Sequence, residues 1–225
     1  MRLVGLAVAL AFSAGTAAAA DCRSAPAPGI DWRDCNKSNL ILKDANLERA
    51  SLVNTDFSET DLRGARLDSA NLEKATLLRA SLAGASAEEA SFAKVEAYRS
   101  DLSGVSAENA SFASAELQRS RFIDAGLKGA DFQKAELGRA DFSGSALADN
   151  SFALANLSRA DFRDARMEGP VDFAGAFLFL TRFEGVDLGA ATGLRQEQID
   201  IACGNAATLL PQGLTAPRTW PCRFD

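Results

Sequence analysis

A large apolar residue recurs at every fifth position along most of this chain. The series runs from Leu42 to Leu82 and, after a thinner stretch, from Phe112 to Phe162. Two positions before most of these residues stands a small one, usually Ala, as at Ala45. A period of five fits neither the 3.6-residue repeat of a helix nor the two-residue repeat of a strand. Each unit must therefore form one side of a coil and then turn a corner.

Four such units would close a square of twenty residues, and successive squares would stack at the strand spacing of about 4.8 Å. Units such as Ala45-Asn46-Leu47 and Ala130-Asp131-Phe132 follow the pattern A-(D/N)-L-x-x, so residues 39–192 resemble the pentapeptide-repeat family. The resemblance implies an all-β fold, a right-handed quadrilateral β-helix. About thirty units predict roughly seven and a half coils and a rod about 35 Å long at the strand spacing.

Leu and Phe are expected to fill the centre of the coils, with Ala allowing the corners to close. From Phe112 onward Phe and Leu alternate, which predicts stacked Phe columns on two opposite sides. In the thin stretch, three central positions hold Ala instead: Ala87, Ala97 and Ala107. We favour relaxed packing there over a binding indentation.

One step of the repeat is six residues long instead of five. Between Met167 and Phe173 the chain passes through Gly169-Pro170-Val171, one residue more than the period allows. An extra residue of this kind produces a bulge or a small loop at a corner.

Irregular segments flank the repeat and are expected to cap it, because a stack of coils has two open ends. Residues 21–38 form the expected N-terminal cap, in which Trp32 covers the first coil. Residues 193–225 form the expected C-terminal cap. There the segment from Leu194 to Cys203 predicts a short helix that stops before Gly204.

Residues 1–20 have the layout of a signal peptide. Arg2 precedes an apolar stretch from Leu3 to Phe12, and small residues follow up to a cleavage motif that ends at Ala20. We therefore expect a periplasmic or secreted protein that is not inserted in a membrane after cleavage. A lipoprotein anchored at Cys22 is the alternative, and Asp21 directly before that cysteine disfavours it.

Four cysteines remain in the exported chain: Cys22, Cys35, Cys203 and Cys222. A metal site is disfavoured because the sequence has no His and no C-x-x-C motif. A disulfide needs Cα atoms within roughly 7 Å, whereas the rod separates the two ends by about 35 Å. Cysteines at the same end must therefore pair, Cys22 with Cys35 and Cys203 with Cys222.

Residues twenty apart stack in such a fold, and one stack consists of arginines: Arg79, Arg99, Arg119, Arg139 and Arg159. Around the next corner lies a column of Asp61, Asp101, Asp141 and Asp161 that Arg121 interrupts. One interpretation is a surface ladder in which each Arg is balanced by a nearby Asp, which contributes about 0 to 1 kcal/mol per exposed pair. The other is a linear strip that binds carboxylates or phosphates of a polymer.

The functional prediction is an exported rigid solenoid that serves as a structural or binding surface, without catalysis or cofactors. Nothing in the repeat gathers a nucleophile, a base and a concave pocket. The predicted partner is a protein or an anionic polymer but not a nucleic acid, and the chain is expected to be a monomer or a homodimer. The resemblance offers an alternative, a DNA mimic that protects gyrase as quinolone-resistance members do. The modest net charge of −6, the Arg column and the export signal disfavour it.

Overall fold

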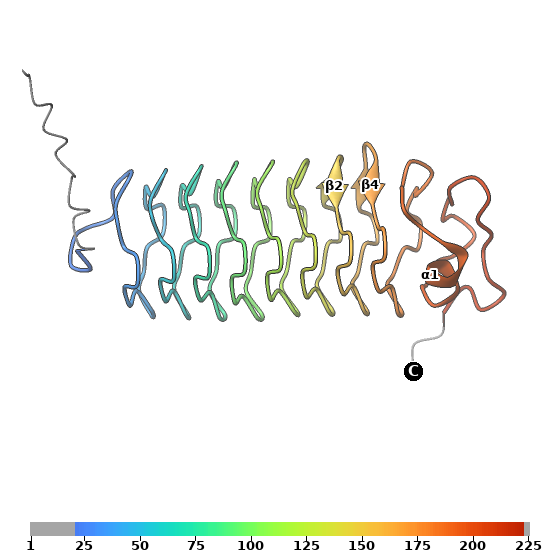
Figure 1. Cartoon of the computed structure of the whole chain (residues 1–225), viewed down its shortest axis with the longest axis horizontal. Helices are drawn as coiled ribbons and strands as arrows, with labels where there is room; N and C mark the ends of the chain where they lie inside the picture. Colours follow the sequence, from blue (N-terminus) through green and yellow to red (C-terminus); the bar gives the residue numbers. More distant parts are fainter. Residues whose placement is uncertain (1–20, 223–225) are drawn as a thin grey trace, which may run out of the picture.

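The computed structural model describes residues 21–222, so the predicted signal peptide lies outside the described residues. The chain winds into a row of stacked coils (Figure 1). Parallel bridges join residues twenty apart, from Asp31 with Ser51 to Asp141 with Asp161. Each coil therefore contains four five-residue sides, as the sequence period predicts.

Regular elements are short and few among the described residues. The strands are β1 (Ala146–Leu147), β2 (Asn150–Ser151), β3 (Arg166–Met167) and β4 (Val171–Asp172), and the helix is α1 (Gln196–Asp200). β1 pairs with β3 and β2 with β4, both in parallel. The rest of the ladder consists of isolated bridges. The described residues therefore contain two two-stranded sheets and no closed sheet.

Each corner is a hydrogen-bonded turn that ends at the small residue of the unit. At one of them the N–H of Ala45 donates to the carbonyl of Leu42 over 3.1 Å, and Asp44 between them has φ 56°. Only the third residue of such a turn has positive φ, which is the type II pattern. The fourth position of the turn is buried and most often holds Ala, as at Ala45 and Ala50.

The centre of the rod is a double stack of Phe rings, as the alternation of Phe and Leu predicts. The Phe132 ring lies parallel to Phe112 at 4.8 Å and to Phe152 at 4.9 Å between centroids. It also meets Phe122 and Phe142, from the opposite side of the coil, edge-on at 5.7 and 5.6 Å. The parallel spacings of 4.8 to 4.9 Å also measure the rise from one coil to the next. In the thin stretch the central side chains of Ala87, Ala97 and Ala107 are buried.

The six-residue step shifts the register of the ladder by one. Ala146 still pairs with Arg166, twenty residues away, whereas Asn150 pairs with Val171, twenty-one residues away. The carbonyl of Pro170 accepts a hydrogen bond of 2.7 Å from the N–H of Asp149. The predicted bulge is therefore present, and the coils after it continue in the new register.

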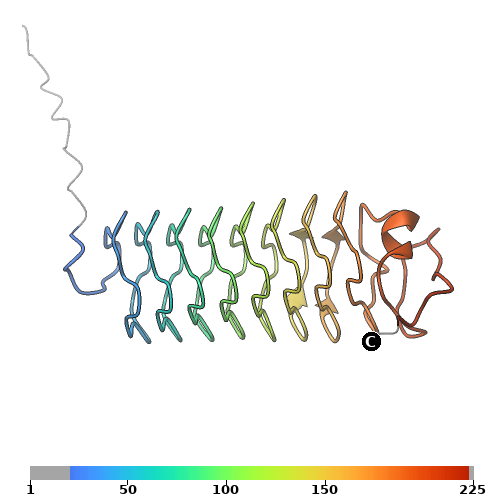
Figure 2. The same cartoon turned by 90° about the horizontal axis from the view of Figure 1, so that it is seen from below.

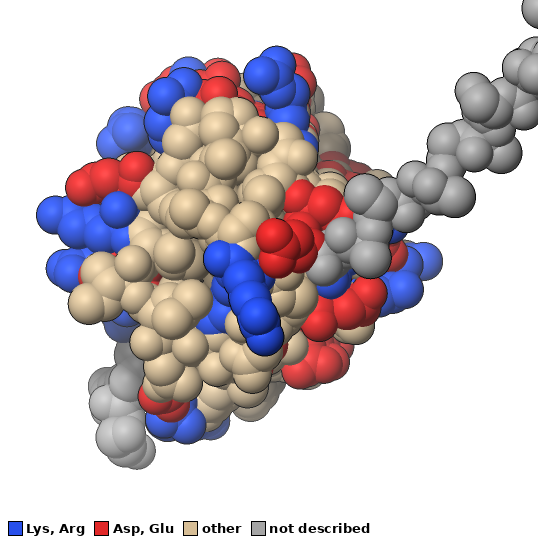
Figure 3. Space-filling view, turned by 90° about the vertical axis from the view of Figure 1, so that its left-hand side faces the viewer, with Lys and Arg blue, Asp and Glu red and all other residues tan. Residues whose placement is uncertain are grey.

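The first coil begins earlier than the sequence suggests, because the ladder starts at Asp31. Trp32 and Lys37 take its central positions and are buried, and the Trp32 ring lies 6.5 Å from that of Phe57. The Lys37 ammonium lies 3.6 Å from the centroid of the Trp32 ring and donates to the carbonyl of Cys22 over 2.7 Å. Seen from this end, charged side chains lie around the edge of the face, and a few also lie across its mostly uncharged middle (Figure 3).

The C-terminal helix is shorter than predicted. α1 ends at Asp200 rather than near Cys203, because the chain rejoins the ladder: the Cys203 N–H donates to the Thr181 carbonyl over 2.8 Å. α1 packs at the end of the stack (Figure 2). Both end segments carry a disulfide, Cys22–Cys35 with Cα atoms 5.4 Å apart and Cys203–Cys222 with Cα atoms 5.5 Å apart.

Candidate binding surface

The five arginines of the predicted strip stand at equivalent corners of successive coils. Each occupies the third position of its turn, with φ between 54° and 61°, and each side chain is exposed. The backbone holds them in register, since the N–H of Arg119 donates to Gly138 over 3.0 Å and that of Arg139 to Ser158 over 2.9 Å. The strip is thus a row of arginines on a rigid backbone, with one arginine per coil.

The arginines differ in what surrounds them. Arg79 forms an ion pair with Glu59 at 3.2 Å, and the Arg99 guanidinium lies 5.1 Å from the centroid of the Tyr98 ring. Within residues 21–222, the other three have no side-chain hydrogen bond and no ion pair: Arg119, Arg139 and Arg159. The C-terminal half of the strip therefore carries three uncompensated positive charges.

The neighbouring Asp column does not balance the strip. Asp61 pairs with Arg63 at 2.6 Å and Asp161 with Arg163 at 2.7 Å, two residues along the same side of the coil in each case. The hydrogen bond from Arg63 lowers the pKa of Asp61 to about 2. Burial raises the pKa of Asp161, but the hydrogen bonds from Arg163 outweigh it and hold that pKa below its usual value. The balanced-ladder hypothesis is therefore wrong for the three arginines at the C-terminal end.

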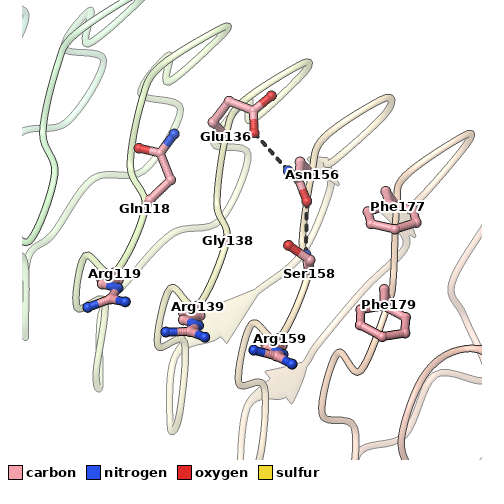
Figure 4. Close-up of a pocket in the computed structure, with 10 residues that line it drawn as sticks. All are labelled: Gln118, Arg119, Glu136, Gly138, Arg139, Asn156, Ser158, Arg159, Phe177 and Phe179. Carbon is pink, nitrogen blue, oxygen red and sulfur yellow. Dashed lines mark hydrogen bonds between the residues drawn. The ribbon is translucent and has the colours of Figure 1, made fainter.

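A groove of about 530 Å³ runs beside these three arginines (Figure 4). Gly138 and Ser158 lie along its floor, and Glu136 and Asn156 lie on the side away from the guanidinium groups. The Asn156 amide donates to Glu136 over 2.8 Å, and its oxygen accepts the N–H of Ser158 over 3.1 Å. The groove thus combines one cationic edge with a polar floor.

Phe177 and Phe179 close the groove at its C-terminal end. Their rings are stacked at 6.2 Å and 13°, and they remain 51% and 43% exposed. The pattern of central positions did not predict this pair, because both residues lie beside a central position and not at one. The six-residue step held the signal, since it aligns these residues with Asn156 and Ser158 of the preceding coil, on either side of the buried Leu178.

A second basic corner borders the same side of the rod. Lys74, Lys94 and Lys134 occupy third turn positions, with φ of 60°, 57° and 58°. This corner is partly neutralised, because Glu73 lies 3.0 Å from the Lys94 ammonium and 4.0 Å from that of Lys74. The Arg strip is therefore the more available of the two cationic edges.

The part of the chain that the structure describes offers neither a cluster of metal ligands nor a membrane-spanning helix. No group of three or more His, Cys, Asp or Glu side chains there is placed to hold a metal ion. No described helix has the length and apolar character needed to cross a bilayer.

Two family models described as pentapeptide repeats match the chain, one over residues 41–77, 70–106 and 108–144 and the other over residues 127–176. No curated protein matches the sequence significantly.

Among solved structures, the chain is similar to QnrB1, a plasmid-mediated fluoroquinolone resistance protein. That likeness, to a trypsin-treated form of QnrB1, has 15% identity and a TM-score of 0.60, covering 82% of this chain and 91% of the treated chain. HetL, a pentapeptide-repeat protein involved in heterocyst differentiation regulation in the cyanobacterium Nostoc, is 21% identical with a TM-score of 0.42, over 82% of this chain and 84% of HetL. The bridges between residues twenty apart and the family models, which cover more than half of the sequence, agree: this chain belongs to the pentapeptide-repeat family.

Proposed function

We propose that this protein is an exported, right-handed solenoid that acts as a rigid, non-catalytic binding surface for an anionic partner outside the cytoplasm. The observation that carries the proposal is the row of three unpaired guanidinium groups at Arg119, Arg139 and Arg159. Like charges held one coil apart repel one another. A partner with carboxylates or phosphates would relieve this repulsion and meet donors whose fork geometry suits those groups.

The rigidity of the row supports binding over a general electrostatic role. The arginines stand on turns whose backbone bonds to the next coil, above a core of stacked Phe rings. Little conformational entropy of the backbone is then lost when a partner binds. A ligand with regularly spaced anionic groups would match such a row better than an irregular one.

The disulfides support export. Cys22–Cys35 and Cys203–Cys222 close loops at both ends of the stack, where coils lack a neighbour on one side. Disulfides persist in oxidising compartments and are rare in the cytosol. Capping by disulfides therefore suits a rod that works in the periplasm or beyond the cell.

A second candidate is protection of a topoisomerase through DNA mimicry. The likeness in fold to QnrB1, a fluoroquinolone resistance protein, favours it. The uncompensated Arg row disfavours it, because a mimic of DNA must present negative charge along its length. This candidate predicts that the purified protein relieves quinolone inhibition of gyrase, whereas our proposal predicts no effect.

Export can be tested with a reporter enzyme that becomes active only after disulfide formation outside the cytoplasm. The reporter is fused to the C-terminus of the full chain and of a matched chain without residues 2–20. We expect activity from the full chain alone. Equal inactivity of both fusions, with both proteins in the cytoplasm, would contradict export and favour the topoisomerase candidate.

A further inference from the structure

We propose that the groove beside Arg119, Arg139 and Arg159 binds an acidic polysaccharide whose rings carry carboxylates, as uronic acids do. This inference rests on the proposed function, because it names the chemical class of the anionic partner. Three features of the groove support it: the guanidinium row, the polar floor and the exposed aromatic pair at its end (Figure 4).

The spacing of the row favours a sugar chain over other polyanions. Successive coils rise by 4.8 to 4.9 Å, and a hexuronate ring, with one carboxylate, is close to one coil in length, so carboxylates that alternate between the two faces of a sugar chain recur on one face about every second arginine. In an extended acidic peptide, side chains on one face recur at about 6.6 to 6.8 Å, twice the rise of a strand residue. Phosphates along a stacked nucleic-acid strand recur at about 3.4 Å. Neither spacing matches the rise of one coil or of two.

The floor of the groove offers groups that suit hydroxyls. One oxygen of Glu136 accepts the Asn156 amide, and in the described structure nothing else is bonded to its other oxygen or to the Ser158 hydroxyl. A carboxylate accepts hydrogen bonds from sugar hydroxyls. The same carboxylate repels the sulfates of a polysulfate, which replace the hydroxyls that a uronate ring keeps beside its carboxylate.

The aromatic pair completes the match. A sugar ring has one face made largely of C–H groups, which packs on the face or edge of an aromatic ring. Phe177 and Phe179 stay half exposed, although the coil directly before them carries the polar residues Asn156 and Ser158 at these positions. Backbone hydrogen bonds fix both residues, with the Phe177 N–H donating to Ala155 over 2.9 Å and the Phe179 carbonyl accepting from Arg159 over 2.8 Å. Exposed apolar groups beside a polar groove commonly mark a binding site.

The test is a calorimetric titration of the full exported chain with polygalacturonate oligomers. The double variant Phe177→Asn/Phe179→Ser carries the residues found one coil earlier, so the fold should tolerate it. Ile41→Ser is the matched control, since Ile41 is 84% exposed at the far end of the rod and Ser81 occupies the same column. We expect the double variant to bind polygalacturonate about tenfold or more weakly than wild type, and Ile41→Ser to bind it as wild type does. The melting temperatures of both variants should equal that of wild type.

Polyglutamate, a single-stranded oligonucleotide, dextran sulfate and neutral dextran complete the panel. We expect each to bind more weakly than polygalacturonate. If the polyanions bind as tightly and the double variant binds like wild type, the sugar-acid inference is wrong while the proposed anion binding stands. Preference for polyglutamate would instead indicate an acidic protein partner. If no polymer binds through the arginines, the proposed function itself fails.

Discussion

A hydrogen bond of 2.8 Å joins two adjacent coils, from the Arg159 N–H to the Phe179 carbonyl. This bond places the last guanidinium of the row directly before the exposed aromatic pair (Figure 4). The ladder that holds the fold together therefore also sets the distance between a charged and an apolar contact.

The turns of the strip constrain which residues can replace its arginines. Arg119 has φ 61°, a region that β-branched residues strongly avoid and glycine adopts freely. We expect Arg119→Val to lower the free energy of unfolding by about 1 to 2 kcal/mol, and Arg119→Gly to leave it nearly unchanged. Urea denaturation of the two variants measures the difference. Equal stabilities would show that the turn conformation is wrong.

The Phe stack should dominate core stability. Phe132 is fully buried and contacts four other rings, so Phe132→Ala is expected to cost about 3 to 5 kcal/mol. Ala97→Leu adds volume at a central position of the thin stretch and should cost much less, or stabilise the fold. Chemical denaturation compares them, and similar losses for both variants would contradict the assignment of the thin stretch.

The ion pair of Arg63 with Asp61 predicts a specific pH dependence. The folded pKa of Asp61 is about 2, below its ordinary value of 3.8, because Arg63 donates hydrogen bonds to the carboxylate. The lowered pKa means that the pair stabilises the fold above pH 3.8, and that this contribution is lost as the pH falls toward 2.

We expect Arg63→Gln to raise the pKa of Asp61 toward 3.8, which an NMR titration of its side-chain carboxyl carbon measures. The equivalent carboxyl of Asp161, paired with Arg163, is the internal control and should titrate as in wild type. An unchanged Asp61 titration in the variant would show that another group lowers its pKa.

The architecture could be predicted from the sequence because one physical requirement repeats at every unit. A buried large residue and a small corner residue at a fixed spacing permit only a coil of this kind. Counting positions in units of five also predicted the bulge before Phe173. The length of the rod that this count gives predicted which cysteines pair. The helix ended earlier than predicted, because hydrogen bonds of Cys203 to the ladder outweighed the local helical pattern.

The binding surface could be predicted only in part. Stacking by twenty identified the Arg column, but it could not indicate which carboxylates reach it. Asp61 and Asp161 pair with nearer arginines on their own sides, and Glu59 reaches Arg79 from one coil away. Which carboxylate pairs with which arginine depends on the direction of each side chain at its corner. The register of the repeat does not specify that direction.

The most direct test of the account compares two triple variants. One variant removes the three unpaired charges of the strip and is Arg119→Asn/Arg139→Asn/Arg159→Asn. The other removes the charges of the second basic corner on the same side and is Lys74→Asn/Lys94→Asn/Lys134→Asn. Both remove three positive charges from turn positions with positive φ, a conformation that Asn tolerates.

The measurement is the affinity of wild type and both variants for polygalacturonate and dextran sulfate at low and moderate salt. We predict that the Arg variant binds about tenfold or more weakly than wild type and loses most of the salt dependence of binding, while the Lys variant binds nearly as wild type does. Equal losses in both variants, or no loss in either, would contradict a binding role for the arginine strip.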